Sequence, residues 1–147
     1  MFENIFNEIY LKFKLNFYRG IFERLHERES SLSASEAYAV EVIHAMNAPT
    51  ISRFANFLQT SQPNATYKVN LLIKKGYIEK INSREDKREY FLRTTEKFRD
   101  YYAINQNYLK LVTQRIRERF SEEELSQFEK MLSIVSQELM NESTEKL

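Results

Sequence analysis

The stretch SQPNATYKVNLLIKKGYIEKINSREDKREYFLRTT, residues 61–95, is the most informative about the fold because its hydrophobic spacing changes once, at Gly76. In the first half, apolar residues recur at the spacing of an α-helix, at Ala65, Val69 and Leu72. Ser61 can cap this helix, and Pro63 fits its first turn, where proline loses no hydrogen bond. Two lysines and a glycine then form a typical helix end. We therefore expect a helix over residues 61–75.

The second half of the stretch predicts an antiparallel β-hairpin. Residues 77–81 and 89–94 are short runs rich in β-branched and aromatic side chains. Residues 82–88 separate the two runs and mix basic with acidic side chains, as a solvent-exposed loop does.

The residues before this stretch supply the remaining helices of the lobe. Ser33 and Glu36 have the spacing of a capping box, so a helix is expected from there to about Met46. Residues 47–50 form a turn, and Thr50 can cap a short helix over residues 51–58. Helices, a short turn and a hairpin in this order predict a winged helix-turn-helix lobe over residues 33–95, with the loop 82–88 at the tip of the wing.

Long amphipathic helices are expected on both sides of the lobe. Apolar residues recur every three or four positions over residues 2–29, and residues 96–120 carry a similar stripe. A capping box at Ser121 and Glu124 begins a last helix with a narrow coiled-coil seam. The chain has too few helices to cover these stripes, which predicts a homodimer built from residues 1–30 and 96–147. The expected contact residues are Phe2, Phe6, Ile9, Leu125, Phe128, Leu132, Val135 and Leu139.

The composition narrows the class of protein. A chain of 147 residues is expected to form a single domain. Two glycines and two prolines leave few turns, so the fold is expected to be mainly α with a small β-hairpin. The lack of cysteine excludes disulfides and thiolate chemistry and fits the cytoplasm. Because charged residues interrupt every apolar stretch, neither a signal peptide nor a membrane span is expected.

The distribution of charge favours double-stranded DNA as the partner. Ten Lys or Arg stand against five Asp or Glu between residues 61 and 99, and residues 61–75 contain no acidic side chain. An acid-free helix face is suited to lie against phosphates, and its amide, hydroxyl and ammonium groups can read bases in a major groove. The expected recognition-helix contacts are Ser61, Gln62, Asn64, Thr66, Tyr67, Lys68 and Asn70. The expected wing contacts are Arg84, Lys87 and Arg88, with Asp86 holding a guanidinium in place.

Catalysis and metal binding have little support in the sequence. The two histidines, His26 and His44, lie on separate expected helices, without the three or four clustered ligands of a zinc site. Neither a phosphate-binding glycine loop nor a nucleophile with a base beside it is present. We expect a protein that is not an enzyme and has no metal and no cofactor.

Residues Leu58 to Lys97 resemble the MarR family of bacterial winged-helix transcription regulators. The wing pattern of that family, Asp-x-Arg followed by a strand and Leu-x-Thr, stands here as DKREYFLRTT, residues 86–95. The family's recognition-helix pattern is similar to Thr66, Val69, Leu72, Lys75 and Gly76.

The resemblance implies a homodimer whose first and last helices interleave, and a repressor that binds a pseudo-palindromic operator with half-sites about 34 Å apart. The family often couples DNA binding to a small effector. Phe13, Phe17, Tyr18 and Tyr38 could line a pocket for it, although we expect these four side chains to be core.

A second hypothesis from another class remains open. The same lobe could be a protein–protein module without specific DNA binding, with Tyr67, Leu71 and Ile73 as its contact face. The two hypotheses differ in the salt dependence of duplex binding, which is steep for a DNA regulator.

Overall fold

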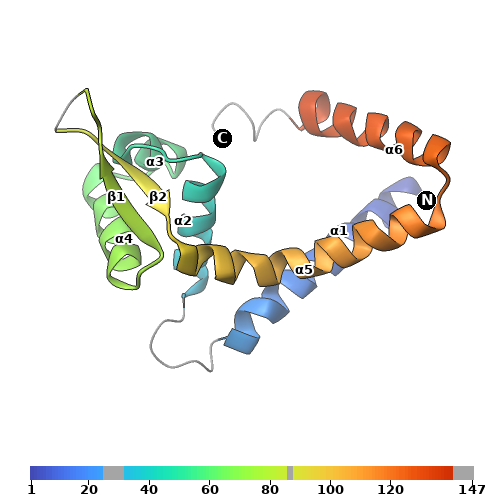
Figure 1. The fold of residues 1–147 in the computed structure, drawn as a ribbon, viewed down its shortest axis with the longest axis horizontal. Helices are drawn as coiled ribbons and strands as arrows, with labels where there is room; N and C mark the ends of the chain where they lie inside the picture. Colours follow the sequence, from blue (N-terminus) through green and yellow to red (C-terminus); the bar gives the residue numbers. More distant parts are fainter. Residues whose placement is uncertain (25–31, 86–87, 141–147) are drawn as a thin grey trace. The chain divides into compact units, whose positions relative to one another are not determined.

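The computed structural model describes residues 1–24, 32–85 and 88–140, except the side chains of residues 21–24 and 104–105. The chain divides into two compact units (Figure 1). One unit comprises residues 18–103 and the other comprises residues 1–17 and 104–147. Among the described residues, no helix is long and apolar enough to cross a membrane.

The unit of residues 18–103 contains a winged helix-turn-helix lobe. Its helices are α2 (Ala34–Ala45), α3 (Ile51–Phe57) and α4 (Gln62–Lys74), and its hairpin strands are β1 (Ile78–Asn82) and β2 (Tyr90–Thr94) (Figure 1). The first turns of α5 (Glu96–Arg119) follow directly. The expected class, mainly α with a small hairpin, is confirmed.

The helix boundaries in the lobe follow from the caps that the sequence predicts. Ser33 and Glu36 form a reciprocal capping box at the start of α2, and Thr50 caps α3. Ser61 caps α4, and a proline lies in the first turn of that helix. Gly76 ends α4 with a φ of +83°, a left-handed conformation that glycine adopts at little cost.

Side chains from every element of the lobe form its core. Phe54, Val69, Leu72, Leu92 and Phe98 are fully buried, and they come from α3, α4, β2 and α5. The strands pair in antiparallel register, from Ile78 opposite Thr94 to Asn82 opposite Tyr90.

The turn before α3 adds a third, very short element to the hairpin. Thr50 forms an isolated antiparallel bridge with Phe91, and Leu92 N–H donates to Pro49 O at 2.9 Å. The wing is therefore attached to the start of α3 as well as to the end of α4.

The second unit contains the first part of α1 (Phe2–Arg24), the rest of α5 and α6 (Glu122–Ile134). The Phe13 and Tyr108 rings meet edge to face with centroids 5.5 Å apart, and this contact joins α1 to α5. A capping box at Ser121 and Glu124 begins α6, as expected.

One helix end differs from the sequence expectation, and another is not tested. The helix predicted over residues 2–29 is described as far as Arg24, and the remaining predicted positions, Leu25 among them, lie outside the described residues. The last helix changes to a π-helix, η1 (Val135–Leu139), before it ends. Its i→i+5 hydrogen bonds change the angular step per residue, so the predicted seam is not continued regularly to Leu139, which is 66% exposed.

Candidate nucleic-acid interface

We call α4 the recognition helix and residues 78–94, the two strands with their loop, the wing. Ser61 Oγ accepts a hydrogen bond from Asn64 N–H, which fixes the start of the recognition helix. Ala65, Val69 and Leu72 are fully buried and anchor one face of the helix in the core. The opposite face therefore points outward and carries several of the predicted contacts. Its exposed residues include Gln62, Pro63, Asn64, Tyr67 and Asn70.

One hollow connects the recognition helix to the wing, and a second, open hollow adjoins it on the helix. One hollow, of about 390 Å³, is lined by the start of α3, the recognition helix and the second half of the wing, through Thr50, Ile51, Ser52, Gln62, Thr66, Arg88, Glu89 and Tyr90. The other, an open hollow of about 580 Å³, is lined by Gln62, Pro63, Thr66, Tyr67 and Asn70. Because Gln62 and Thr66 line both, the two hollows form one continuous surface.

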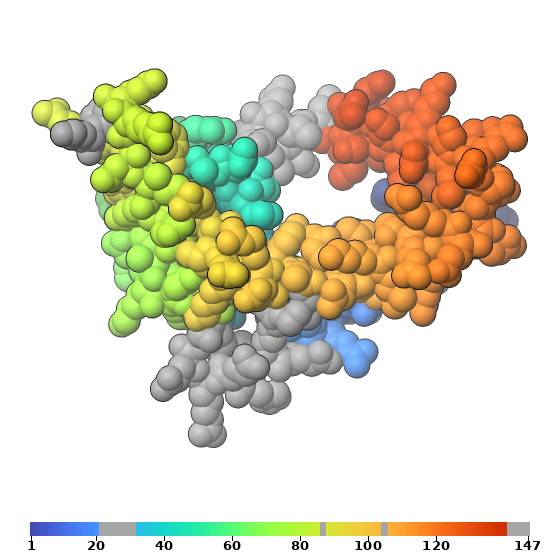
Figure 2. All heavy atoms as spheres, viewed as in Figure 1, coloured from blue at the N-terminus to red at the C-terminus, as the bar shows by residue number. Residues whose placement is uncertain are grey.

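The wing presents basic residues at both ends of its loop. Arg84 and Arg88 are exposed, and Ser83 N–H donates to Glu89 O at 2.9 Å to close the loop. In Figure 2 the described residues on either side of the loop, at the upper left, project beyond the helices of the lobe. The predicted contacts Asp86 and Lys87 lie outside the described residues.

Two lysines of the recognition helix and its cap bind within the lobe. Lys68 Nζ donates to Ser35 Oγ at 2.9 Å, and Lys75 Nζ donates to Glu36 Oε2 at 2.6 Å. The sequence gives no indication of either contact, because the partners are 33 and 39 residues away. Lys68, a predicted base or phosphate contact, is thus directed towards α2.

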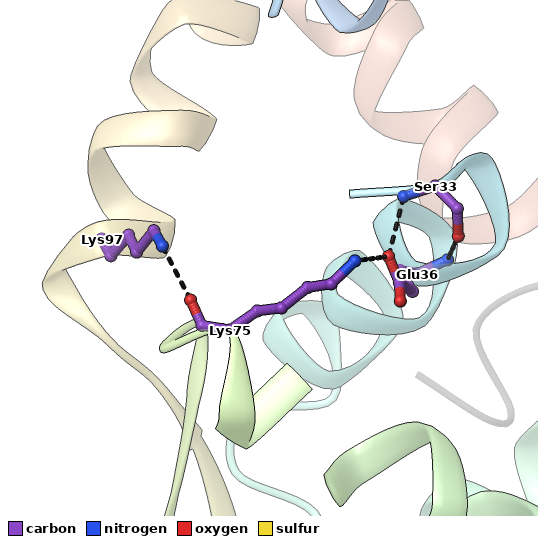
Figure 3. A network of polar contacts seen from close by, with 4 residues as sticks. All are labelled: Ser33, Glu36, Lys75 and Lys97. Atoms are coloured by element: carbon purple, nitrogen blue, oxygen red, sulfur yellow. Dashed lines mark hydrogen bonds and ion pairs between the residues drawn. The ribbon is translucent and has the colours of Figure 1, made fainter. Parts of the chain in front are cut away.

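Lys75 belongs to a wider polar network that holds three helices together (Figure 3). Lys97, in the first turn of α5, donates to Lys75 O at 2.7 Å, and Ser33 N–H donates to Glu36 Oε2 at 2.8 Å. Partial burial of Glu36 opposes its ionisation, but the hydrogen bonds from Lys75 and Ser33 and the Lys75 charge outweigh it. The pKa of Glu36 is therefore below its ordinary value.

The predicted dimer contacts lie on exposed apolar surface. Phe2, Phe6 and Ile9 are each at least half exposed, and Phe128 and Leu132 are more than 40% exposed. Leu125 and Val135 are half-buried. A hollow of about 310 Å³ lies beside this surface, lined by Ile116, Phe120, Glu124, Leu125, Gln127, Phe128 and Met131.

Several side chains differ from their expected surroundings. Tyr18 and Tyr38 are exposed, so the expectation that they are core is wrong, whereas Phe13 and Phe17 are half-buried. Leu71 and Ile73, two of the three residues of the alternative contact face, are half-buried, and Tyr67 alone is largely exposed, at 65%.

The two histidines give no metal site within the described part of the chain. His44 Nδ1 lies 3.4 Å from Thr94 Oγ1, and its ring packs against Phe98 and Tyr102. No group of three or more metal-binding side chains occurs among residues 1–24, 32–85 and 88–140. His26 lies outside these ranges.

Sequence reasoning missed part of the surface beside the wing. Thr50, Ser52 and Tyr90 line the hollow there, although they were assigned only to a cap, a helix and a strand. The bridge between Thr50 and Phe91, which brings these segments together, has no sequence pattern that could have revealed it.

Solved structures with the same fold include several regulators. FabT of Streptococcus pneumoniae, solved in complex with DNA, is 25% identical with a TM-score of 0.62, over 96% of this chain and 99% of FabT. Transcriptional regulator Tm0710 of Thermotoga maritima is 19% identical with a TM-score of 0.63, over 99% and 98% of the two chains. A MepR mutant of S. aureus, bound to an oligodeoxyribonucleotide, is 18% identical with a TM-score of 0.57, over 95% and 99%.

Sequence comparison also identifies the lobe. No curated protein matches the chain. Residues 32–90, which span α2 to the start of β2, match the model of the MarR family. Residues 32–90 therefore form a lobe similar to the MarR family of winged-helix, DNA-binding transcription regulators, and the chain shares the fold of the regulators named above.

Proposed function

We propose that the protein is a sequence-specific transcription repressor that acts in the cytoplasm as a homodimer on a pseudo-palindromic operator. The observation that carries this proposal is the continuous surface of the recognition helix and the wing. It is acid-free over residues 61–75, joins the wing through Gln62 and Thr66, and has exposed arginines at the wing loop. The DNA complexes of FabT and of the MepR mutant support DNA as the partner.

The wing has a separate part in the proposal from that of the recognition helix. Phosphate contacts fix the register of a protein on the duplex, whereas contacts to base edges select the sequence. Arg84 and Arg88 are placed to bind phosphates or the minor groove beside the recognition helix. The outward face of the recognition helix, with Asn64 and Tyr67, then faces the bases.

The exposed apolar surface of residues 1–17 and 104–140 supports the homodimer. Phe2 is 74% exposed, and large apolar side chains line much of α1 and α6. Monomeric soluble proteins rarely leave such a wide apolar surface in contact with water. A two-fold partner would cover it and would place two recognition helices about one turn of DNA apart.

Repression and effector response complete the proposal. A dimer that covers two half-sites within a promoter excludes RNA polymerase from the same DNA, which makes repression the simplest consequence of binding. The 310 Å³ hollow at the end of α5 is within the size range of small-molecule sites, and its lining is mostly apolar. An effector bound there would act by changing the geometry of the dimer.

Selection of bound duplexes from a random pool, near physiological salt, tests this function. We expect an enriched palindrome with half-sites about 10 base pairs apart, and light scattering should give the mass of a dimer. Affinity for the selected duplex should fall steeply as salt rises. A pool without enrichment, at any protein concentration that remains soluble, would contradict the proposal.

A further inference from the structure

We propose that the recognition helix reads A·T base pairs, and that Tyr67 determines this specificity by contacting the C5-methyl group of thymine. The inference rests on the proposed function, because it names the class of sequence that the same surface selects. Its support lies in the chemistry of the side chains around the 580 Å³ hollow.

The floor of this hollow combines apolar groups with amides. Pro63, Thr66 and Tyr67 contribute ring and methyl carbons, and Gln62 and Asn70 contribute the amides. In the major groove, a thymine presents a methyl group and favours apolar contact, whereas an adenine presents a donor and an acceptor that match the amide of Asn or Gln. The lining therefore contains the matching group for each partner of an A·T pair.

Arginine and lysine are missing from the lining of this hollow. Guanine is read chiefly by Arg or Lys through its two acceptors. The recognition helix contains no arginine, and its exposed Lys74 lies in the last turn, beyond the lining. Lys68, the lysine nearest the hollow in sequence, donates to Ser35 on α2.

Tyr67 is the most suitable group in the hollow to make the methyl contact. Its side chain is 65% exposed on the outward face of a helix whose other face is fully anchored. A rigid ring with two rotatable bonds loses little entropy when it is fixed against a base. Thr66, which is half-buried, lines the same hollow and can offer its methyl group to the same base.

The wing adds an independent preference of the same kind. Arg84 and Arg88 flank the wing loop, and arginine is attracted to the narrow minor groove of A-tracts. Arg88 lines the hollow that adjoins the recognition helix. The base pairs for which the wing prefers A·T would therefore lie next to the half-site that the recognition helix reads.

The test compares the full-length wild type with Tyr67→Ala and Tyr67→Phe on chemically altered duplexes. The starting duplex is the selected operator, and each half-site thymine is replaced in turn by deoxyuridine. This replacement removes one methyl group and keeps the base pair. We expect at least one replacement to weaken wild-type binding about fourfold, the loss for one buried methyl group. Tyr67→Phe should show the same loss, and Tyr67→Ala should show none at that position.

A second measurement replaces single A·T pairs of the half-site by G·C. The affinity of the wild type should fall about tenfold to a hundredfold when a base pair that the recognition helix contacts is replaced. Circular dichroism should give the same melting temperature for the wild type and both variants, since an exposed side chain is removed.

The outcomes separate this inference from the proposed function. Enrichment of a G·C half-site, or equal sensitivity of the wild type and Tyr67→Ala to deoxyuridine, would overturn the A·T inference and leave a sequence-specific regulator. Failure to enrich any duplex would overturn both.

Discussion

Lys75 Nζ lies 2.6 Å from Glu36 Oε2, and this contact joins the end of the recognition helix to the capping box of α2. The Glu36 side chain is 14% exposed and that of Lys75 is 30% exposed, so water screens the pair only in part. Glu36 Oε2 also accepts the Ser33 N–H. One carboxylate therefore determines both where α2 begins and how the recognition helix is held against it.

Glu36→Gln should lower the free energy of unfolding by about 1.5 kcal/mol at pH 7, the lower range for a hydrogen bond to a charged group. Glutamine keeps the capping geometry, so the loss reports the ion pair. Because the folded-state pKa of Glu36 is lowered, the stabilisation is present above the unfolded-state pKa of about 4.3. This stabilisation should disappear as the pH falls through the folded-state pKa of Glu36.

Urea unfolding at fixed protein concentration, between pH 7 and pH 3, measures this difference. Glu79→Gln is the matched control, because its partner Arg93 lies 2.7 Å away in an exposed pair. We expect a change of about 0.5 kcal/mol or less for the control. If both variants lose the same free energy of unfolding, partial burial does not strengthen the Glu36–Lys75 ion pair.

Arg88→Ala should weaken binding to all duplexes by a similar factor, since the wing contacts backbone or groove and not individual bases. The slope of log affinity against log salt should fall by about 0.9 if one phosphate contact is lost. Electrophoretic mobility shifts over a salt series measure this slope. Arg93→Ala is the control: Arg93 lies in strand β2 of the same hairpin, pairs with Glu79 on β1, and its loss should keep the wild-type slope.

Ser61 allows helix capping to be separated from DNA binding. Ser61→Ala should cost about 1 kcal/mol of stability, because Asn64 N–H loses its acceptor. Ser61→Asp should keep the stability of the wild type, since aspartate is an equally good cap. Its negative charge, however, lies at the proposed DNA surface and should lower affinity. Thermal melting and duplex titration of both variants check these two effects, and wild-type affinity of Ser61→Asp would exclude a DNA contact at this helix start.

Leu132→Asp should convert the dimer to a monomer. The side chain is 47% exposed on α6, and an aspartate buried at an interface would be left without a partner. Ser126→Asp places the same charge at an exposed position of the same helix and should remain dimeric. Light scattering distinguishes the two masses. If Leu132→Asp is still a dimer, the seam of α6 is not the interface.

Gly76→Ala should destabilise the lobe by about 1–2 kcal/mol, because alanine is strained at a φ of +83°. Space is not the cause, since an added Cβ would lie 3.6 Å from the Lys97 side chain, an ordinary contact. Gly76→Asn should cost less, as asparagine tolerates this conformation. Urea midpoints of the two variants should therefore differ, and equal midpoints would argue against backbone strain.

The local elements of this protein follow from its sequence. Caps at Ser33, Thr50, Ser61 and Ser121, and the glycine that ends α4, depend on residues within a few positions of one another. The buried face of the recognition helix follows from spacing alone, and so does its outward face. For this reason the winged helix-turn-helix and the amino acids on its exposed surface could be predicted.

Which of those surface groups have partners within the protein depends on tertiary packing. In the sequence, Lys68 and Lys75 cannot be distinguished from lysines that bind phosphate. In the structure they donate hydrogen bonds to Ser35 and Glu36. The bridge from Thr50 to Phe91 likewise joins distant segments and forms the hollow beside the wing. Such contacts depend on how helices pack, and a long lysine side chain can reach partners that no periodicity specifies.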